Sequence, residues 1–200
     1  MKLYDYLPSG NGYKVRLLLS WLGEDYDFVA LNIHAGDTKT PDFLAKNPAG
    51  QIPLLELDDG RVLAESNAIM FYLALGSDYL PTDAFAQGEV LRWMFFEQYK
   101  HEPSIAVARF IHNYAYEDRK RELPALMKKG KAALDVMEGH LNNYDFFVGD
   151  KLSIADIALY AYTHVGEEGK FDLKSYKAIR AWLNRVKKHP NYIKITDIPK

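Results

Sequence analysis

Cysteine is absent from this 200-residue chain. Its absence excludes disulfide scaffolds, cysteine nucleophiles, CxxC redox pairs and metal sites built on thiolates. No stretch approaches the roughly 18 apolar residues that a membrane-spanning helix requires. The N-terminal run MKLYDYLPSGNG also lacks the long apolar segment of a signal peptide. We therefore expect a soluble, cytoplasmic protein with no membrane partner.

An excess of positive charge is also missing. The chain has 25 Lys and Arg residues against 27 Asp and Glu, a formal net charge of −2. Nucleic-acid binding needs clustered positive charge, so this balance argues against a nucleic-acid partner, although a basic patch can hide in a balanced total. His101, His112 and His140 show no metal-ligand spacing, and we expect no metal. With 48% hydrophobic residues, the chain can build a sizeable core, in one domain or two.

The first 76 residues alternate between strand-like and helix-like segments. A β-α-β start implies a parallel strand pair with a right-handed crossover. The turn Asp58-Asp59-Gly60 predicts a hairpin that adds an antiparallel edge. The expected α/β domain therefore has a mixed four-stranded sheet and the order βαβαββα, over residues 2–7, 12–23, 25–33, 40–47, 52–57, 61–64 and 65–76.

The remainder of the chain is helical in pattern. Residues 77–83, SDYLPTD, resemble a linker, and residues 84–200 form an expected all-helical domain. One long helical segment covers 84–118, with Pro103 expected to kink or break it. A helix at 123–141 presents one apolar stripe if Gly130 is a point of close packing. LSIADIALYAY begins a helix capped by Ser153, with Asp156 at the third position, and a last helix ends before Pro190.

Two features of the stretch NPAGQIPLLELDDGRVLAESN suggest more than packing. Pro53 either simply begins a strand or follows a cis peptide bond that would turn the backbone of Gln51 and Ile52 toward an extended peptide. Glu65-Ser66 stands at a helix N-terminus, where free N–H groups and the helix dipole attract carboxylates. The plainer interpretation is an ordinary N-cap and a solvated acid. A ligand with both amine and carboxylate, such as an amino-acid head group, would fit the pair.

The run NPAGQIPLLELDDGRVLAESNAIMFYL closely resembles the glutathione-binding segment of glutathione transferases, and SIAD is typical of their helical half. The resemblance covers essentially the whole chain. It implies a thioredoxin-like domain over 1–76, a linker over 77–83 and a helical domain over 84–200. It further implies that the Ile52–Pro53 bond is cis and that Glu65 and Ser66 hold the γ-glutamyl end of glutathione, the cosubstrate.

In this family the residue that contacts the glutathione sulfur follows the first strand, here YLPSGNGYKV. Ser9 lies where serine-type enzymes place their hydroxyl, and Asn11 matches the asparagine of nu-type enzymes. Both could instead serve only as loop and cap residues, and Tyr4 and Tyr6 are expected to pack in the sheet. Neither Ser9 nor Asn11 is a strong base. Each can donate a hydrogen bond that lowers the thiol pKa from about 8.5.

The resemblance assigns further residues to glutathione. Gln51, with Thr38 or Lys39, would face its glycyl end, and the plainer interpretation of Lys39 is a surface lysine. The backbone of Ile52 and Pro53 completes the predicted site.

The second substrate is expected between the domains, against the long helix of the helical half. The candidates for this pocket are Tyr99, Arg109, Phe110 and Tyr114, although at least half of the aromatic residues on this helix are expected in the core. Arg109 could be an ion-pair partner or could bind an anionic substrate. The resemblance implies a homodimer, formed through the helix that carries the aromatic run EVLRWMFFEQY, with Arg92 as a possible interfacial charge.

The resemblance to glutathione transferases implies three alternative functions. The first is a glutathione transferase of detoxification that activates the thiol for attack on an electrophilic hydrophobic compound. The second is a glutathione-dependent disulfide-bond reductase or peroxidase, which the Asn11 loop favours. The third is a binding or regulatory module without catalysis, because fold does not determine function.

Overall fold

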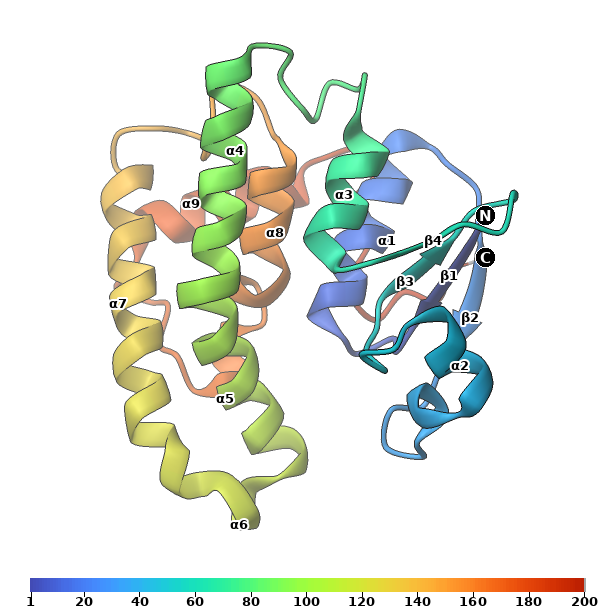
Figure 1. The fold of residues 1–200 in the computed structure, drawn as a ribbon. Helices are drawn as coiled ribbons and strands as arrows, with labels where there is room; N and C mark the ends of the chain where they lie inside the picture. The colour runs from blue at the N-terminus through green and yellow to red at the C-terminus, as the bar shows by residue number, and fades with distance from the viewer. Residues whose placement is uncertain (200) are drawn as a thin grey trace. The chain divides into compact units, whose positions relative to one another are not determined.

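The computed structural model describes residues 1–199, which form two compact units (Figure 1). The first contains Met1–Ser77 together with residues 190–199, and the second is Asp78–His189. Across these residues, no helix combines the length and apolar character needed to cross a membrane.

The first unit is the expected α/β domain. The strands pair in the order β2-β1-β3-β4, with β1 and β2 parallel and the other pairs antiparallel. The mixed four-stranded sheet and the order βαβαββα are thus confirmed. The elements are β1 (Lys2–Asp5), α1 (Gly10–Leu22), β2 (Asp27–Ala30), a 3₁₀ turn (Asp37–Lys39), α2 (Pro41–Lys46), β3 (Leu54–Glu56), β4 (Val62–Ala64) and α3 (Ser66–Ala74).

The two faces of this sheet carry different helices, because side chains alternate along each strand. On one face, Leu3 and its register partner Leu55 pack with Val15 and Leu19 of α1 and Ile69 of α3. Figure 1 shows α1 and α3 together on this side of the sheet.

The opposite face is covered by α2. The Tyr4 ring meets Phe43 edge-on with centroids 6.1 Å apart. The Tyr4 hydroxyl donates to Glu56 at 2.8 Å, and Lys46 pairs with the same carboxylate. Tyr4 therefore packs in the sheet as predicted.

Local signals account for where these helices begin and end. Thr40 caps α2 by accepting the Phe43 N–H, and Pro41 occupies the first turn. Gly23 ends α1 at φ 71°, a conformation that glycine adopts without a side-chain clash. The first strand ends at Asp5, earlier than predicted, because the chain then turns with Ser9 N–H donating to the Tyr6 carbonyl at 2.7 Å.

The second unit is helical throughout. Its helices are α4 (Ala84–Phe96), α5 (Glu102–Tyr114), α6 (Tyr116–Arg119), α7 (Leu123–Leu141), α8 (Ile154–Thr163) and α9 (Lys177–Lys187). A π-helical segment (Glu97–His101) joins α4 to α5, and 3₁₀ turns lie at Lys120–Glu122 and Gly166–Gly169. The predicted helix over 123–141 matches α7, and α9 ends before Pro190 as expected.

Pro103 lies just after the point where the π-helical segment gives way to α5. It occupies the first turn of α5, where its missing N–H costs least, and the preceding turn widens into the π-helical segment. The predicted 84–118 segment is therefore a succession of helical elements rather than one helix.

Asp156 organises the interior of the helical unit. Its buried carboxylate accepts hydrogen bonds from the Ser153 N–H and hydroxyl, the Phe147 N–H and the Trp182 indole N–H, at 2.9–3.2 Å. This carboxylate thus joins the start of α8 to α9 and to the preceding loop. Gly130 is the point of close packing on which the apolar stripe of α7 depends, because a β-carbon there would overlap the Phe171 ring.

The last ten described residues depart from the predicted domain boundary. The sequence predicts that residues 190–199 belong to the helical domain, whereas in the structure they belong to the first unit. The physical reason is a set of hydrogen bonds to α1. Tyr13 donates to the Ile193 carbonyl at 2.7 Å and Ser20 to the Asn191 carbonyl at 2.8 Å.

Candidate functional site

Ser9 joins the first strand to the first helix. Its backbone is extended, and its Oγ accepts the Gly12 N–H at 3.3 Å as the N-cap of α1. A hydroxyl that accepts this bond still carries its own hydrogen, which it can donate to a ligand. The two interpretations of Ser9 from sequence, helix cap and ligand contact, are therefore compatible.

Asn11 and Ser66 bring two helix N-termini together. Asn11 is the second residue of α1 and Ser66 the first of α3, and the two helices pack against each other. Asn11 Oδ1 accepts from the Lys14 ammonium at 2.9 Å and from the Ser66 hydroxyl at 3.5 Å. Both helix N-termini and the buried Lys14 contribute positive potential here, so the arrangement favours an anion.

Glu65 has an unusual backbone conformation. It lies at φ 70° and ψ 112°, directly before Ser66. A residue with a side chain pays about 1–3 kcal/mol for such a conformation, and these strained residues cluster at ligand sites. The Glu65 side chain is exposed, whereas Ser66 is buried. The strained turn thus leaves a carboxylate in solvent beside a hydroxyl at the helix start.

The segment before β3 carries the remaining predicted backbone contacts. The peptide bond between Ile52 and Pro53 is cis. Asn47 Nδ2 donates to the Gln51 carbonyl at 2.8 Å, while the Gln51 side chain is exposed. Gln51 is therefore held through its carbonyl, with its amide side chain in solvent.

Lys39 contacts the same loop. Its ammonium donates to the Gly50 carbonyl at 3.0 Å and more weakly to that of Ala49 at 3.4 Å. Neighbouring Thr38 is buried. Lys39 therefore holds the loop that precedes Gln51, a role that the sequence did not reveal. Its contact with a ligand carboxylate stays a prediction.

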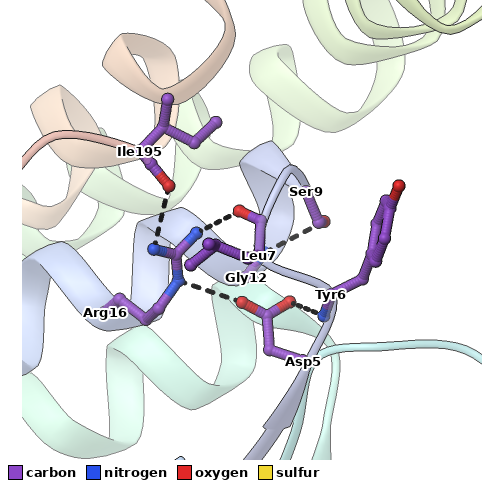
Figure 2. A network of polar contacts seen from close by, with 7 residues as sticks. All are labelled: Asp5, Tyr6, Leu7, Ser9, Gly12, Arg16 and Ile195. Atoms are coloured by element: carbon purple, nitrogen blue, oxygen red, sulfur yellow. Dashed lines mark hydrogen bonds and ion pairs between the residues drawn. The ribbon is translucent and has the colours of Figure 1, made fainter. Parts of the chain in front are cut away.

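Behind the Ser9 loop lies a buried polar network that sequence reasoning missed (Figure 2). Arg16 Nε donates to Asp5 Oδ2 at 3.0 Å, and both side chains are fully buried. The other Asp5 oxygen accepts the Tyr6 N–H at 2.7 Å. The signal was present in the sequence, because Asp5 and Arg16 are charged residues within an apolar strand and helix, where such charges are paired when buried.

Burial raises the pKa of Asp5 from its ordinary 3.8 to about 7. Arg16 and the Tyr6 N–H act in the opposite direction because they stabilise the carboxylate. Gly12 packs directly against this carboxylate, because a β-carbon at position 12 would overlap it. Position 12, in the first turn of α1, therefore has space for glycine alone.

The four predicted second-substrate residues lie in the helical unit, in different surroundings. Arg109 Nε pairs with Glu168 at 2.6 Å, so of its two predicted roles the ion pair is observed. The Phe110 and Tyr114 rings lie 5.5 Å apart. Tyr99 is 74% exposed and lines a separate hollow of about 430 Å³ between the π-helical segment and α7. Their predicted contact with a second substrate stays a prediction.

Chemically, the α1–α3 site offers hydrogen-bond donors and positive potential. The hydroxyls of Ser9 and Ser66 and the amide of Asn11 are not bases of useful strength near neutral pH. In residues 1–199 there is no cluster of three His, Asp or Glu side chains that could hold a metal ion. The site can therefore stabilise a thiolate or carboxylate that a ligand brings with it.

Comparison with known proteins matches both halves of the chain to one family. Residues 1–75 match the glutathione S-transferase N-terminal domain and residues 92–190 the C-terminal domain. A crystal structure of a glutathione S-transferase from Pseudomonas fluorescens is 53% identical, covers 98% of both chains and superposes with a TM-score of 0.96. A glutathione S-transferase-like protein of a Fusarium species is 33% identical, over 92% of this chain and 87% of its own.

Two further relatives differ in their named activities. The disulfide-bond oxidoreductase YfcG of Escherichia coli is 25% identical over 92% of this chain and 89% of its own. A maleylacetoacetate isomerase of Methylobacterium extorquens, solved with malonate and glutathione bound, is 28% identical. It covers 94% of this chain and 92% of its own, with a TM-score of 0.80.

Proposed function

Because this chain belongs to the glutathione S-transferase family, we propose that it binds glutathione at the joined N-termini of α1 and α3 and activates its thiol. The activated thiolate attacks an electrophilic hydrophobic compound. The observation that carries this proposal is the approach of Asn11 Oδ1 to Ser66 Oγ at 3.5 Å, which makes one polar site from two helix N-termini.

In this mechanism Ser9 and Asn11 are the catalytic residues. Each donates a hydrogen bond to the glutathione sulfur, which stabilises the thiolate over the thiol and lowers the pKa. Lys14 supports Asn11, because its ammonium binds Oδ1 and thereby turns the Nδ2 hydrogens away from itself. The sulfur is the nucleophile, and the protein supplies position and electrostatic stabilisation. A chain without cysteine can perform thiol chemistry in this way.

Other residues bind the ends of the tripeptide. Ser66 and the α3 N-terminus hold the γ-glutamyl carboxylate, and Glu65 pairs with its amine. The backbone at Ile52 and Pro53 receives the middle of the peptide. Gln51, with Thr38 or Lys39, faces the glycyl end.

The second substrate contacts Tyr99, Arg109, Phe110 and Tyr114 of the helical unit. In this role Arg109 would bind an anionic group while paired with Glu168. The chain acts as a homodimer, and the exposed aromatic side chains of α4 support this, since Phe85 is 79% and Phe95 60% exposed. Detoxification and a cytoplasmic location complete this proposal.

A disulfide-bond reductase is the second candidate. The likeness to the oxidoreductase YfcG favours it, as does the Asn11 loop. In that reaction the bound glutathione thiolate attacks a disulfide sulfur and forms a mixed disulfide, releasing the other thiol.

Calorimetric titration with glutathione and with oxidised glutathione tests both candidates. It is paired with turnover of a chlorodinitrobenzene and of a small aliphatic disulfide. Binding of glutathione, with an ultraviolet thiolate signal below the free thiol's pKa, is the result expected for a transferase. A preference for the oxidised form and for the disulfide would identify the reductase. If neither form binds, both enzyme functions are wrong and a non-catalytic module is left.

A further inference from the structure

Arg16 connects the end of β1 and the loop that follows it with a segment that lies far away in the sequence. Its Nε donates to Asp5 at the end of β1, one terminal nitrogen donates to the Leu7 carbonyl at 2.6 Å, and the other to the Ile195 carbonyl at 3.1 Å (Figure 2). The planar guanidinium is suited to this because its donors point in fixed directions. One side chain thus holds a strand end, the Ser9 loop and the C-terminal segment (residues 190–199).

The bonds to Arg16 determine where the Ser9 loop lies. Leu7, which Arg16 binds, is two residues before Ser9. The backbone of Tyr6 is fixed at both of its polar groups: its N–H donates to Asp5 Oδ1, and its carbonyl accepts the Ser9 N–H. The loop is therefore positioned from behind by the Asp5–Arg16 pair. Since Arg16 is fully buried, it can influence a ligand only through these neighbours.

The C-terminal segment holds Arg16 in turn. Tyr13, Arg16 and Ser20 lie on one face of α1, at the spacing of successive helical turns. Each donates a side-chain hydrogen bond to a backbone carbonyl of the C-terminal segment, at Ile193, Ile195 and Asn191 respectively. The segment thus lies along α1 at the face from which Arg16 reaches the loop.

We propose that Arg16 is a positioning residue for thiol activation, and that the C-terminal segment acts through it on the Ser9 loop. This inference rests on the proposed function, in which the Ser9 hydroxyl donates to the glutathione sulfur. The network of Asp5, Arg16 and the C-terminal segment would hold that hydroxyl in position from the other side of the loop. Small displacements of a catalytic group have large effects on rate, up to about 100-fold for 1 Å. Residues 191–195 therefore contribute to the thiol site without touching glutathione.

The test compares Arg16→Lys with the double variant Tyr13→Phe/Ser20→Ala. Arg16→Lys keeps the charge beside Asp5 but cannot reach Leu7 and Ile195 at once. The double variant releases the C-terminal segment and leaves the bonds from Arg16 to the loop intact. Arg185→Lys is the matched control, because Arg185 also binds a carbonyl and a carboxylate, those of Asp145, in the helical unit.

Each variant is titrated with glutathione between about pH 5 and pH 9, and the bound thiolate is followed by ultraviolet absorbance. We expect Arg16→Lys to raise the pKa of the bound thiol by about one unit, a tenfold change in ionisation, and to lower kcat by about 10- to 100-fold. KM for glutathione should change little. The double variant should also raise the thiol pKa and lower kcat, each by a smaller amount. Arg185→Lys should change neither the thiol pKa nor kcat.

A folded Arg16→Lys protein with wild-type thiol pKa and kcat would overturn the inference while leaving the proposed function intact. If Arg16→Lys does not fold, the double variant is used instead, and wild-type thiol pKa and kcat in that variant would overturn the inference. A wild-type protein that binds glutathione without forming thiolate would overturn the proposed function, and this inference with it. Circular dichroism of each variant separates loss of fold from loss of position.

Discussion

The Asn11 amide oxygen accepts hydrogen bonds from Lys14 at 2.9 Å and from Ser66 at 3.5 Å. Asn11 and Ser66 are 55 positions apart, and they meet because α1 and α3 pack on the same face of the sheet. Asn11, proposed to activate the sulfur, and Ser66, proposed to hold the head group, therefore belong to one hydrogen-bonded unit. Variants on either side of it should nevertheless separate turnover from binding.

The first prediction concerns the Ser9 hydroxyl. Ser9→Gly removes the donor but keeps a good N-cap residue, so stability should fall by only a few tenths of a kcal/mol. Turnover should fall with little loss of glutathione affinity, and the same is expected of Asn11→Ala. Ser9→Asp retains the cap acceptor but adds a negative charge, which should raise the bound thiol's pKa further. Steady-state kinetics with thiolate titration measures these effects, and unchanged turnover in Ser9→Gly would remove Ser9 from the mechanism.

Glu65 should show opposite effects on stability and on binding. Glu65→Gly relieves the backbone strain at φ 70° and should stabilise the protein by about 1 kcal/mol. It also removes the carboxylate proposed to pair with the glutathione amine, so affinity should fall. Glu65→Ala is the matched variant, which loses the same affinity without the gain in stability. Chemical denaturation and calorimetric titration measure the two quantities.

Ser66 is the residue whose substitution should affect glutathione affinity rather than turnover. Ser66→Ala should weaken glutathione binding and leave kcat at saturation nearly unchanged, because the head group takes no part in the chemistry. A fall in kcat with unchanged affinity would show that the division into sulfur-activating and head-group residues is wrong.

Gly12 should tolerate no side chain. A β-carbon there would overlap the buried Asp5 carboxylate, which is held on both oxygens, so Gly12→Ala should destabilise the protein by about 3 kcal/mol or more. Gly88→Ala is the control within another helix, because a β-carbon at position 88 meets nothing within 4 Å. It should stabilise by about 0.5–1 kcal/mol. Equal effects in the two variants would contradict the packing at Asp5.

Asp5 should make stability depend on pH. The folded protein keeps a proton on Asp5 up to about pH 7, whereas an unfolded Asp releases it near pH 3.8. The stabilising contribution of this group is therefore complete below about pH 4 and is lost as the pH rises toward 7. Buried Asp156, with its pKa raised to about 6 by burial, acts in the same direction.

Carboxyl carbon-13 resonances of aspartate measure this titration directly. Two aspartates should titrate near pH 6–7, and one of these signals should disappear in Asp5→Asn. His164 acts in the opposite direction, since burial lowers its pKa to about 4 and its contribution is lost as the pH falls below about 6.5. Direct observation of the aspartates therefore separates the two effects. Titration of all aspartates below about pH 5 would contradict the assignment.

Local signals in the sequence were enough for most of the fold. The capping residues Thr40 and Ser153 act within one turn of the helices that they begin, so their roles could be predicted from neighbouring residues. The same is true of Gly23. The Glu65-Ser66 pair was placed at a helix start for this reason, and the structure places it there.

What the sequence did not reveal depends on contacts between distant residues. Arg16 and Ile195 are 179 positions apart, and no local pattern connects a helix side chain with the carbonyl of a late segment. The partner of Arg109 was equally hidden, because Glu168 lies 59 positions away. The backbone of Glu65 was also unpredicted, since a strained conformation contradicts the local preference of the residue.

The return of residues 190–199 to the first unit has a consequence during synthesis on the ribosome. The α/β unit is composed of two stretches of chain separated by the entire helical unit. While the helical unit is being made, the nascent α/β unit lacks the carbonyls that Arg16, Tyr13 and Ser20 bind. It therefore stays incomplete until residues 190–199 have been synthesised, and a fragment that ends at Ser77 should remain in that incomplete state.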